Sequence, residues 1–253
     1  MRLDLRKQAL AHMPVLPAFD PSMRRAAEIT WRGRMINEYC SAQVFETLAK
    51  QLEAAGAPPD RAERCRAFAA EERLHGVLCG AVVQALGGQA VADLPEQEPV
   101  PTHPEVSPLE GVLRNLIHIS CMSETVAVAL IGAERLEMPE GPLRELLTQI
   151  YADECGHANF GWRLVGELIA QDPRVIRGLN EYLLLAFAHL EQHELAHLPE
   201  GARATGPELG LCDGRDAREL FYAAVENVIV PGLDSHGLSA SWAWENRALA
   251  LEN

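Results

Sequence analysis

Aromatic and basic residues are both scarce in this chain, and each scarcity argues against a class of protein. Aromatic side chains make up 6% of the residues, whereas alanine and leucine are abundant, a balance that favours helices over sheets. Lysine and arginine together number 22 against 36 aspartates and glutamates, which gives a formal net charge of −14. This excess of negative charge argues against nucleic acid and against anionic membrane surfaces as partners.

Other common signals are missing as well. The six cysteines never occur as Cys-x-x-Cys, so we expect buried, reduced thiols and no zinc or disulfide framework. The N-terminal stretch MRLDLRKQALAHM lacks the apolar core of a signal peptide, and no apolar run approaches the length of a membrane span. We therefore expect a cytoplasmic protein that does not use a membrane.

No stretch alternates between apolar and polar residues as a strand would, and proline and glycine divide the chain into long helical segments. Asp20-Pro21 is typical of an N-cap followed by the first helical residue. A proline-rich segment, 89–108, and a second break, 199–214, interrupt the helical pattern. We expect helices over residues 21–55, 59–87, 109–137, 142–171, 173–198 and 216–230. Interruptions at Pro231-Gly232 and at Gly237 should then precede a last short helix to the end.

The lengths of the connections predict the topology. A short turn joins helix 21–55 to helix 59–87, and another joins 109–137 to 142–171, so each pair should form an antiparallel hairpin. The segment between the hairpins is long enough to cross from one end of a bundle to the other. A domain boundary there is the alternative, but a single hairpin is too thin to bury its apolar face.

The second helix of each hairpin carries one copy of the same pattern. The copies are Glu72-Arg73-Leu74-His75 and Glu154-Cys155-Gly156-His157. In each, a carboxylate and an imidazole lie three residues apart and so share one helix face. Both pairs fall among the apolar residues of their helices. Because a carboxylate is costly to bury unless a positive charge meets it, we predict that a metal ion does so.

The first helix of each hairpin should then supply one more carboxylate. Helix 109–137 offers Glu124, the acid that stands at its middle. Helix 21–55 offers two candidates: Glu46, whose height along the hairpin better matches Glu72, and Glu38, which lies on the apolar arc. Glu46 shares its face with polar residues, and an exposed carboxylate needs no metal. We therefore favour Glu38 and keep Glu46 as the alternative.

The resulting pattern resembles that of the ferritin-like superfamily of dinuclear carboxylate proteins, over roughly residues 21–171. The resemblance implies a ferritin-like four-helix bundle with one long crossover and a metal site in the bundle core. The helices expected in residues 172–253 lie outside the resemblance. We expect an all-α fold in which the bundle and these additional C-terminal helices form one domain, 1–253. The residues expected to hold the metals and carry catalysis are Glu38, Glu72, His75, Glu124, Glu154 and His157.

Proteins of this superfamily with such a site bind two iron ions, or iron and manganese, or two manganese ions, and use O2 as a co-substrate. We expect an oxidase or oxygenase that acts on a small organic molecule, with an external electron donor and a homodimer as one conceivable assembly. A ferroxidase that stores or detoxifies iron is one alternative. The other is a non-catalytic helical bundle whose buried Glu and His residues pair with each other.

The helix over 173–198 carries His189, His193 and His197 at intervals of four residues, so that all three share one face. Such a stripe could hold a second metal or add a ligand to the main centre. The simpler interpretation is a partly exposed helix end whose histidines titrate in solvent.

Overall fold

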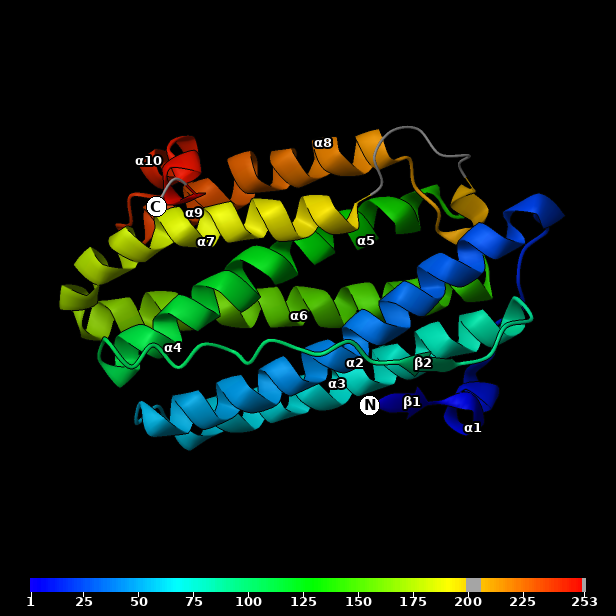
Figure 1. Ribbon diagram of the computed structural model, residues 1–253, viewed down its shortest axis with the longest axis horizontal. Helices are drawn as coiled ribbons and strands as arrows, with labels where there is room; N and C mark the ends of the chain where they lie inside the picture. Colours follow the sequence, from blue (N-terminus) through cyan, green and yellow to red (C-terminus); the bar gives the residue numbers. More distant parts are fainter. Residues whose placement is uncertain (199–205, 252–253) are drawn as a thin grey trace. The chain divides into compact units, whose positions relative to one another are not determined.

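The computed structural model describes residues 1–198 and 206–251, and this part of the chain is predominantly helical (Figure 1), which confirms the all-α class. The chain divides into two compact units. Unit 1 comprises Met1–Val100, Ile131–Asp153 and Ala204–Cys212, and unit 2 comprises Pro101–Leu130, Glu154–Arg203 and Asp213–Asn253. Helices α5 (Glu124–Glu137) and α6 (Pro142–Gln171) each contribute residues to both units. The expectation of a single domain stays a prediction.

The first predicted hairpin is present in unit 1. A 3-10 turn, η2 (Pro21–Met23), leads into α2 (Arg24–Ala54), and the Asp20 carboxylate caps the turn by accepting from the Ser22 amide at 2.9 Å. Gly56 adopts a positive φ of 74°, which ends α2 and turns the chain into α3 (Pro59–Ala85). The two helices pack side by side along their lengths (Figure 1).

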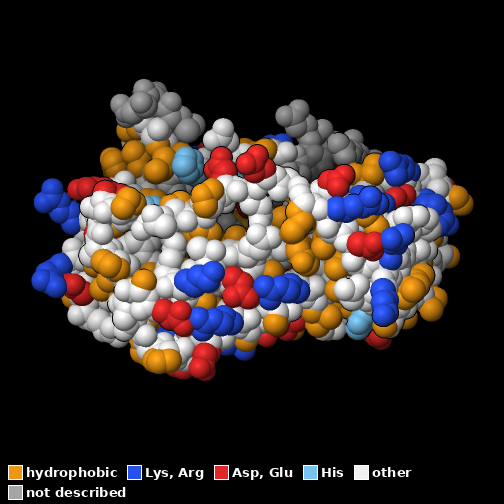
Figure 2. All heavy atoms as spheres, turned by 60° about the horizontal axis from the view of Figure 1, so that its bottom comes forward, with side chains coloured by type: hydrophobic (Ala, Val, Ile, Leu, Met, Phe, Trp, Pro, Cys, Tyr) orange, Lys and Arg blue, Asp and Glu red, His pale blue; other side chains and the backbone are white. Residues whose placement is uncertain are grey.

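The outward face of this hairpin is polar and carries ion pairs from helix to helix. Arg66 contacts Glu53 at 2.5 Å, and Arg73 contacts Glu46 at 3.0 Å. The face drawn in Figure 2 shows basic and acidic side chains interspersed, and exposed ion pairs of this kind each contribute little to stability.

The expectation that the chain has no strand is wrong at one place. Strands β1 (Arg2–Asp4) and β2 (Val91–Asp93) pair antiparallel, with Leu3 opposite Ala92. Leu3 is buried between the exposed Arg2 and Asp4, so the alternation is present but only three residues long. Pairing with a segment far away in the sequence makes it a strand, and a local pattern cannot reveal that. Helix α1 (Arg6–Ala9) and the 3-10 turn η1 (Leu10–His12) follow β1.

The core of unit 1 forms where α2 and α3 meet the beginning of α6. Trp31, Met35, Val82 and Leu147 are buried together there. The Trp31 indole also donates a hydrogen bond to the carbonyl of Leu209, at 2.8 Å, which ties the 3-10 turn η5 (Pro207–Leu209) to α2.

Unit 2 begins with α4 (Pro108–Leu116), which continues as a π-helical segment, η3 (Ile117–Ser123), before α5 starts at Glu124. The predicted helix 109–137 is therefore present but is widened in its middle. Farther along, unit 2 contains the second part of α6, then η4 (Pro173–Val175), α7 (Ile176–His197), α8 (Gly214–Ala224), η6 (Val225–Ile229), α9 (Val230–Ser235), α10 (Ala240–Glu245) and η7 (Arg247–Leu251).

The predicted break at Pro231-Gly232 is wrong, because α9 continues the π-helical η6 through both residues. The predicted interruption at Gly237 is confirmed, since α9 ends just before it and Gly237 has a positive φ of 81°. Of the predicted break 199–214, residues 199–205 lie outside the described part of the chain, as do the last two residues of the predicted terminal helix. The rest of unit 2 packs around α7, where the rings of Phe187 and Trp244 lie 5.5 Å apart.

The stretch Pro108–Glu137 is 30 residues long, has a mean hydropathy of 1.7 in its most apolar window, and passes the length and composition test for a membrane span. The expectation that no apolar run has this length is therefore wrong. The finding is weak evidence for a membrane, since the core helix of a soluble protein passes the same test, and 44% of that window is buried inside the protein.

Candidate metal centre

Helix α3 buries the first Glu-x-x-His pair. Glu72 is 2% exposed and His75 is fully buried, within the same stretch of α3 as the buried Cys65, Phe68 and Cys79. The sequence-based inference that this pair lies on an apolar face is confirmed. A carboxylate at such a position requires a counter-charge or hydrogen-bond donors, so its surroundings decide its role.

The imidazole of His75 is held from two sides. Its Nε2 lies 3.1 Å from Oδ2 of Asp153, and its Nδ1 lies 3.4 Å from Oε2 of Glu38. Both neighbours are carboxylates, which only accept hydrogen bonds when ionised. Because the Asp153 contact is the shorter and forms a hydrogen bond, we assign the proton to Nε2, which donates it to Asp153. This tautomer leaves the lone pair of His75 on Nδ1, the nitrogen that faces Glu38.

Asp153 was not among the residues predicted from the sequence. It stands directly before Glu154 on α6, and a carboxylate behind a metal-binding histidine is a common way to fix the ring and raise its basicity. Two consecutive acids on an amphipathic helix are a weak signal, because one of them normally faces solvent, and Asp153 is indeed partly exposed.

The second Glu-x-x-His pair lies on α6. Glu154 is 3% exposed and His157 is fully buried. The Nδ1 atom of His157 lies 3.1 Å from Oε2 of Glu154 and 3.9 Å from Oε2 of Glu124, which is itself buried at the first position of α5. The structure thus brings His157 together with both of the acids predicted for this half of the site.

Glu124 owes its position to the π-helical segment η3 that precedes it. A π-helix has a wider turn than an α-helix, and single π-turns occur frequently at functional sites. Within η3, Ser120 is fully buried against α6, where a Cβ on Gly161 would lie 2.2 Å from the Ser120 Cβ. Only glycine at position 161 permits this approach, and no sequence signal for the π-segment was recognised.

The predicted residues fall into two overlapping groups whose potential ligand atoms lie within 4.8 Å of one another. One group is Glu38, Glu72, His75 and Glu154, and the other is Glu72, Glu124, Glu154 and His157. Glu72 and Glu154 belong to both. These buried Glu and His side chains could hold a metal ion, because carboxylate oxygen and imidazole nitrogen are donors that divalent transition metals accept.

The structure separates the two candidates on α2. The Glu38 side chain is 14% exposed and lies beside His75, whereas the Glu46 side chain is 35% exposed and pairs with Arg73. Glu46 thus already has a positive partner near the surface, whereas Glu38 stands within the carboxylate and imidazole group.

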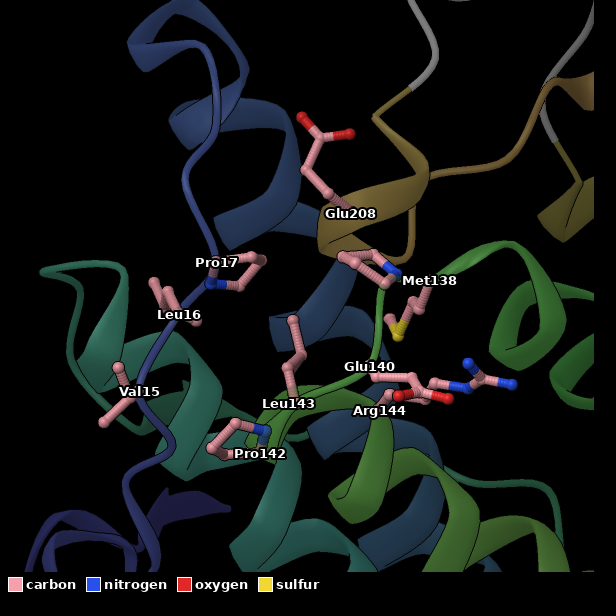
Figure 3. A pocket seen from close by; sticks show the side chains of 11 residues that line it. Val15, Leu16, Pro17, Met138, Glu140, Pro142, Leu143, Arg144 and Glu208 are labelled. Carbon is pink, nitrogen blue, oxygen red and sulfur yellow. The ribbon is translucent and has the colours of Figure 1, made fainter.

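A hollow of about 100 Å³ lies apart from these residues, within unit 1 (Figure 3). Its walls are mainly apolar and come from the N-terminal segment, the turn before α6 and η5, and they comprise Val15, Leu16, Pro17, Met138, Pro139, Glu140, Gly141, Pro142, Leu143, Arg144 and Glu208. None of the six predicted ligands lines it. Sequence analysis did not anticipate it, since it joins three segments that are distant along the chain.

Comparison with known proteins adds no further identification. No family model matches the chain, and neither a curated protein nor a solved structure is found similar to it. What can be said of the site therefore rests on its own side chains: buried Glu and His residues of a helical protein, arranged within metal-binding distance and compatible with a dinuclear centre.

Proposed function

We propose that this chain is a ferritin-like dinuclear metalloprotein that uses O2 to oxidise a small organic molecule. The observation that carries the proposal is that Glu72 and Glu154 belong to both groups of potential ligands. Carboxylates common to two metal positions are what a centre with two bridged ions requires. In this assignment Glu38 and His75 complete one position, and Glu124 and His157 complete the other.

The chemistry of the donors favours iron or manganese. The ligand set has four carboxylates and two imidazoles and no thiolate, which suits iron and manganese better than metals that prefer soft ligands. Two divalent ions carry four positive charges, and these balance the four carboxylates, so the group can be buried without a net charge. Two iron ions, an iron–manganese pair or two manganese ions all satisfy this balance.

When bound, the two ions supply electrons and a place for O2 to react. The protein's own part is to hold them. Asp153 fixes the His75 ring by accepting the proton of His75 Nε2. Burial of Glu72 and Glu154 keeps water from competing with these carboxylates for the metal ions. We propose an external electron donor to restore the reduced state, and a homodimer as one conceivable assembly.

Oxidation of an organic substrate is favoured over iron storage by the helices that follow α6. Helices α7, α8, α9 and α10 add walls that a pocket for a small molecule needs and that an iron store does not. The size of the protein in solution tests this choice, because a store must assemble into a large shell. A monomer or dimer supports the enzyme, and a shell would replace it by the ferroxidase alternative.

The proposal is tested first by metal content. Protein produced with added iron should contain about two iron or manganese ions per chain, the stoichiometry of a dinuclear site. Glu72→Ala should lose most of both ions, because Glu72 belongs to both groups of ligands. Glu72→Gln, which keeps the side-chain volume, guards against a simple packing defect. Glu46→Ala is the matched control on the surface of α2 and should retain both ions.

A folded wild-type protein that takes up no iron or manganese after loading would overturn the proposal. Equal loss from Glu72→Ala and Glu46→Ala would overturn the assignment of the ligands. If the centre is established, anaerobic loading with Fe(II) followed by O2 should oxidise the iron rapidly in the wild type. The Glu72 variants should do so no faster than free Fe(II) in the same buffer.

A further inference from the structure

Trp162 is a half-buried residue of α6 that is not among the proposed metal ligands. It stands five residues after His157 on the same helix. Its indole N–H donates a hydrogen bond to the hydroxyl of Thr125, at 3.1 Å. Thr125 directly follows the proposed ligand Glu124 in the first turn of α5. The hydrogen bond therefore joins the two helices that carry Glu124 and His157.

The directions of the two side chains fit this contact. Side chains of a helix lean toward its N-terminus, so the indole of Trp162 reaches back toward the turn that carries His157. An indole N–H can only donate, and the Thr125 hydroxyl is therefore the acceptor. Thr125 is 8% exposed, and a hydrogen bond at such a buried position is costly to leave unmade. The contact thus fixes how far α5 is displaced along α6.

A second contact of α6 lies on the other side of Glu124. Gly161, the residue before Trp162, packs so closely against Ser120 of η3 that no side chain would fit at position 161. Ser120 lies one turn before Glu124, whereas Thr125 directly follows it. Consecutive residues of α6 therefore hold the chain on both sides of Glu124, which limits the movement of its carboxylate.

The indole is itself held by helices that follow the four-helix pattern. Its ring stacks on that of His236, with centroids 6.2 Å apart and planes inclined by 26°. A Cβ on Gly232 of α9 would lie 2.7 Å from Cη2 of Trp162. A Cβ on Gly166 of α6 would lie 2.8 Å from Cε1 of His236. The backbones of α9 and α6 thus approach the two rings closely, and this packing fixes the direction of the indole N–H.

We propose that Trp162 is a positioning residue for the metal position that Glu124 and His157 complete. Its hydrogen bond to Thr125 sets the height of Glu124 relative to His157, and α9 supports the indole. Metal ligands must lie within about 0.2 Å of their proper distances, so a small shift of α5 should weaken binding. All of these residues belong to unit 2. The inference rests on the proposed dinuclear centre and gives the C-terminal helices a part in metal binding.

The test is a titration of chelator-treated, full-length protein with Mn(II), in which electron paramagnetic resonance reports the unbound ion. Wild type should bind about two ions per chain. Trp162→Phe keeps a ring but removes the N–H, and Thr125→Val keeps the shape but removes the hydroxyl. Each should weaken binding of one ion by about 10-fold, the lower end of what outer partners of a metal ligand contribute. Thr125→Ser keeps the hydroxyl and should bind both ions as wild type does.

A double-mutant cycle identifies which metal position is affected. In Glu124→Gln, which already disables the position concerned, Thr125→Val should cause no further loss. In Glu38→Gln, which leaves that position intact, Thr125→Val should cause its full loss of about 10-fold. Gly232→Ala should displace the indole and weaken the same ion, although none of the proposed ligands stands on α9.

Trp31→Phe is the matched control, because the Trp31 indole donates a comparable hydrogen bond, to the carbonyl of Leu209 at 2.8 Å, within unit 1. This variant should melt at a lower temperature and still bind both ions as tightly as wild type. Wild-type affinity in Trp162→Phe and Thr125→Val, or an equal loss in Trp31→Phe, would overturn the positioning role alone. A wild-type protein that binds no Mn(II) would overturn the dinuclear centre and this inference with it.

Discussion

Glu-x-x-His stands on three helices of this protein, and its surroundings differ between them. On α3 and α6 the pairs Glu72/His75 and Glu154/His157 are buried and lie among other carboxylates. On α7 the histidine His197 is exposed and its nearest ring is another histidine. The same spacing thus occurs in a buried group of carboxylates and imidazoles and in an exposed pair of histidines. Spacing places two side chains on one face, but burial and neighbours decide which metal, if any, they suit.

The largest expected effect concerns the buried carboxylates, which should lower the free energy of unfolding of the metal-free protein. Glu154→Gln should raise the free energy of unfolding in chelator by ~1–3 kcal/mol, because it removes a buried charge from a crowd of carboxylates. With iron in 1,000-fold excess over its dissociation constant, wild type should gain about 4 kcal/mol that the variant lacks. Thermal melts in chelator measure the first difference, and thermal melts with added iron measure the second.

Glu46→Gln, on the exposed side of α2, is the control for that pair of melts. It should change neither the chelator value nor the gain on adding iron. A Glu154→Gln protein that is less stable than wild type in chelator would mean that the carboxylates are satisfied without metal, and the contrast between buried and exposed pairs would fail.

The π-segment beside α6 provides the next largest effect. Gly161→Ala should destabilise the protein by ~1–3 kcal/mol, because the new methyl group would overlap the Ser120 side chain in a packed interface. Gly33→Ala, in an exposed turn of α2 with nothing near the added carbon, should instead stabilise it by about 1 kcal/mol. Urea unfolding of both variants measures these changes in the free energy of unfolding. Equal changes would show that η3 can shift to make room for the added methyl group.

Asp153→Asn tests how much of the buried site depends on the partner of His75. An amide can donate where the carboxylate accepted, so the ring loses its fixed tautomer, and metal affinity should fall about 10- to 100-fold with little change in stability. Cys155→Ser on the same helix is the comparison, since this residue is partly exposed and belongs to neither ligand group. Affinity equal to wild type in Asp153→Asn would remove Asp153 from the site.

The smallest effect is expected for a carboxylate that is entirely in water. The Arg6 guanidinium lowers the pKa of the exposed Asp4 to about 2. A pKa depressed in the folded state adds stability above the unfolded value and loses it as the pH falls from about 4 toward 2. Arg6→Gln should return the pKa of Asp4 toward 3.8, as NMR titration would show, without a measurable change in melting temperature at pH 7.

Local signals in the sequence were sufficient for the helical class and for most of the helix boundaries. Proline and glycine mark the ends of α2, α3 and α6 because their backbone restrictions act wherever they occur. The burial of Glu72 and Glu154 also followed from their place among apolar neighbours. The choice between Glu38 and Glu46 rested on the same argument, and the structure places only Glu38 beside His75.

What local signals could not reveal depends on contacts between distant segments. The pairing of Leu3 with Ala92 needs two strands that are weak by themselves. The π-turn before Glu124 reflects the close approach of Ser120 to α6, and nothing in the residues of η3 announces it. Asp153 is an ordinary surface acid until His75 is placed beside it.

The arrangement on α6 also bears on how this chain can change length during evolution or engineering. Asp153, Glu154 and His157 lie within little more than one turn of one helix. A single residue inserted between Glu154 and His157 would therefore rotate the remainder of α6 by ~100° and turn His157 away from its neighbours. Residues 94–107 have no helix or strand and are largely exposed. Insertions, fluorescent labels or whole domains are best accommodated there, whereas α6 tolerates substitutions only at constant length.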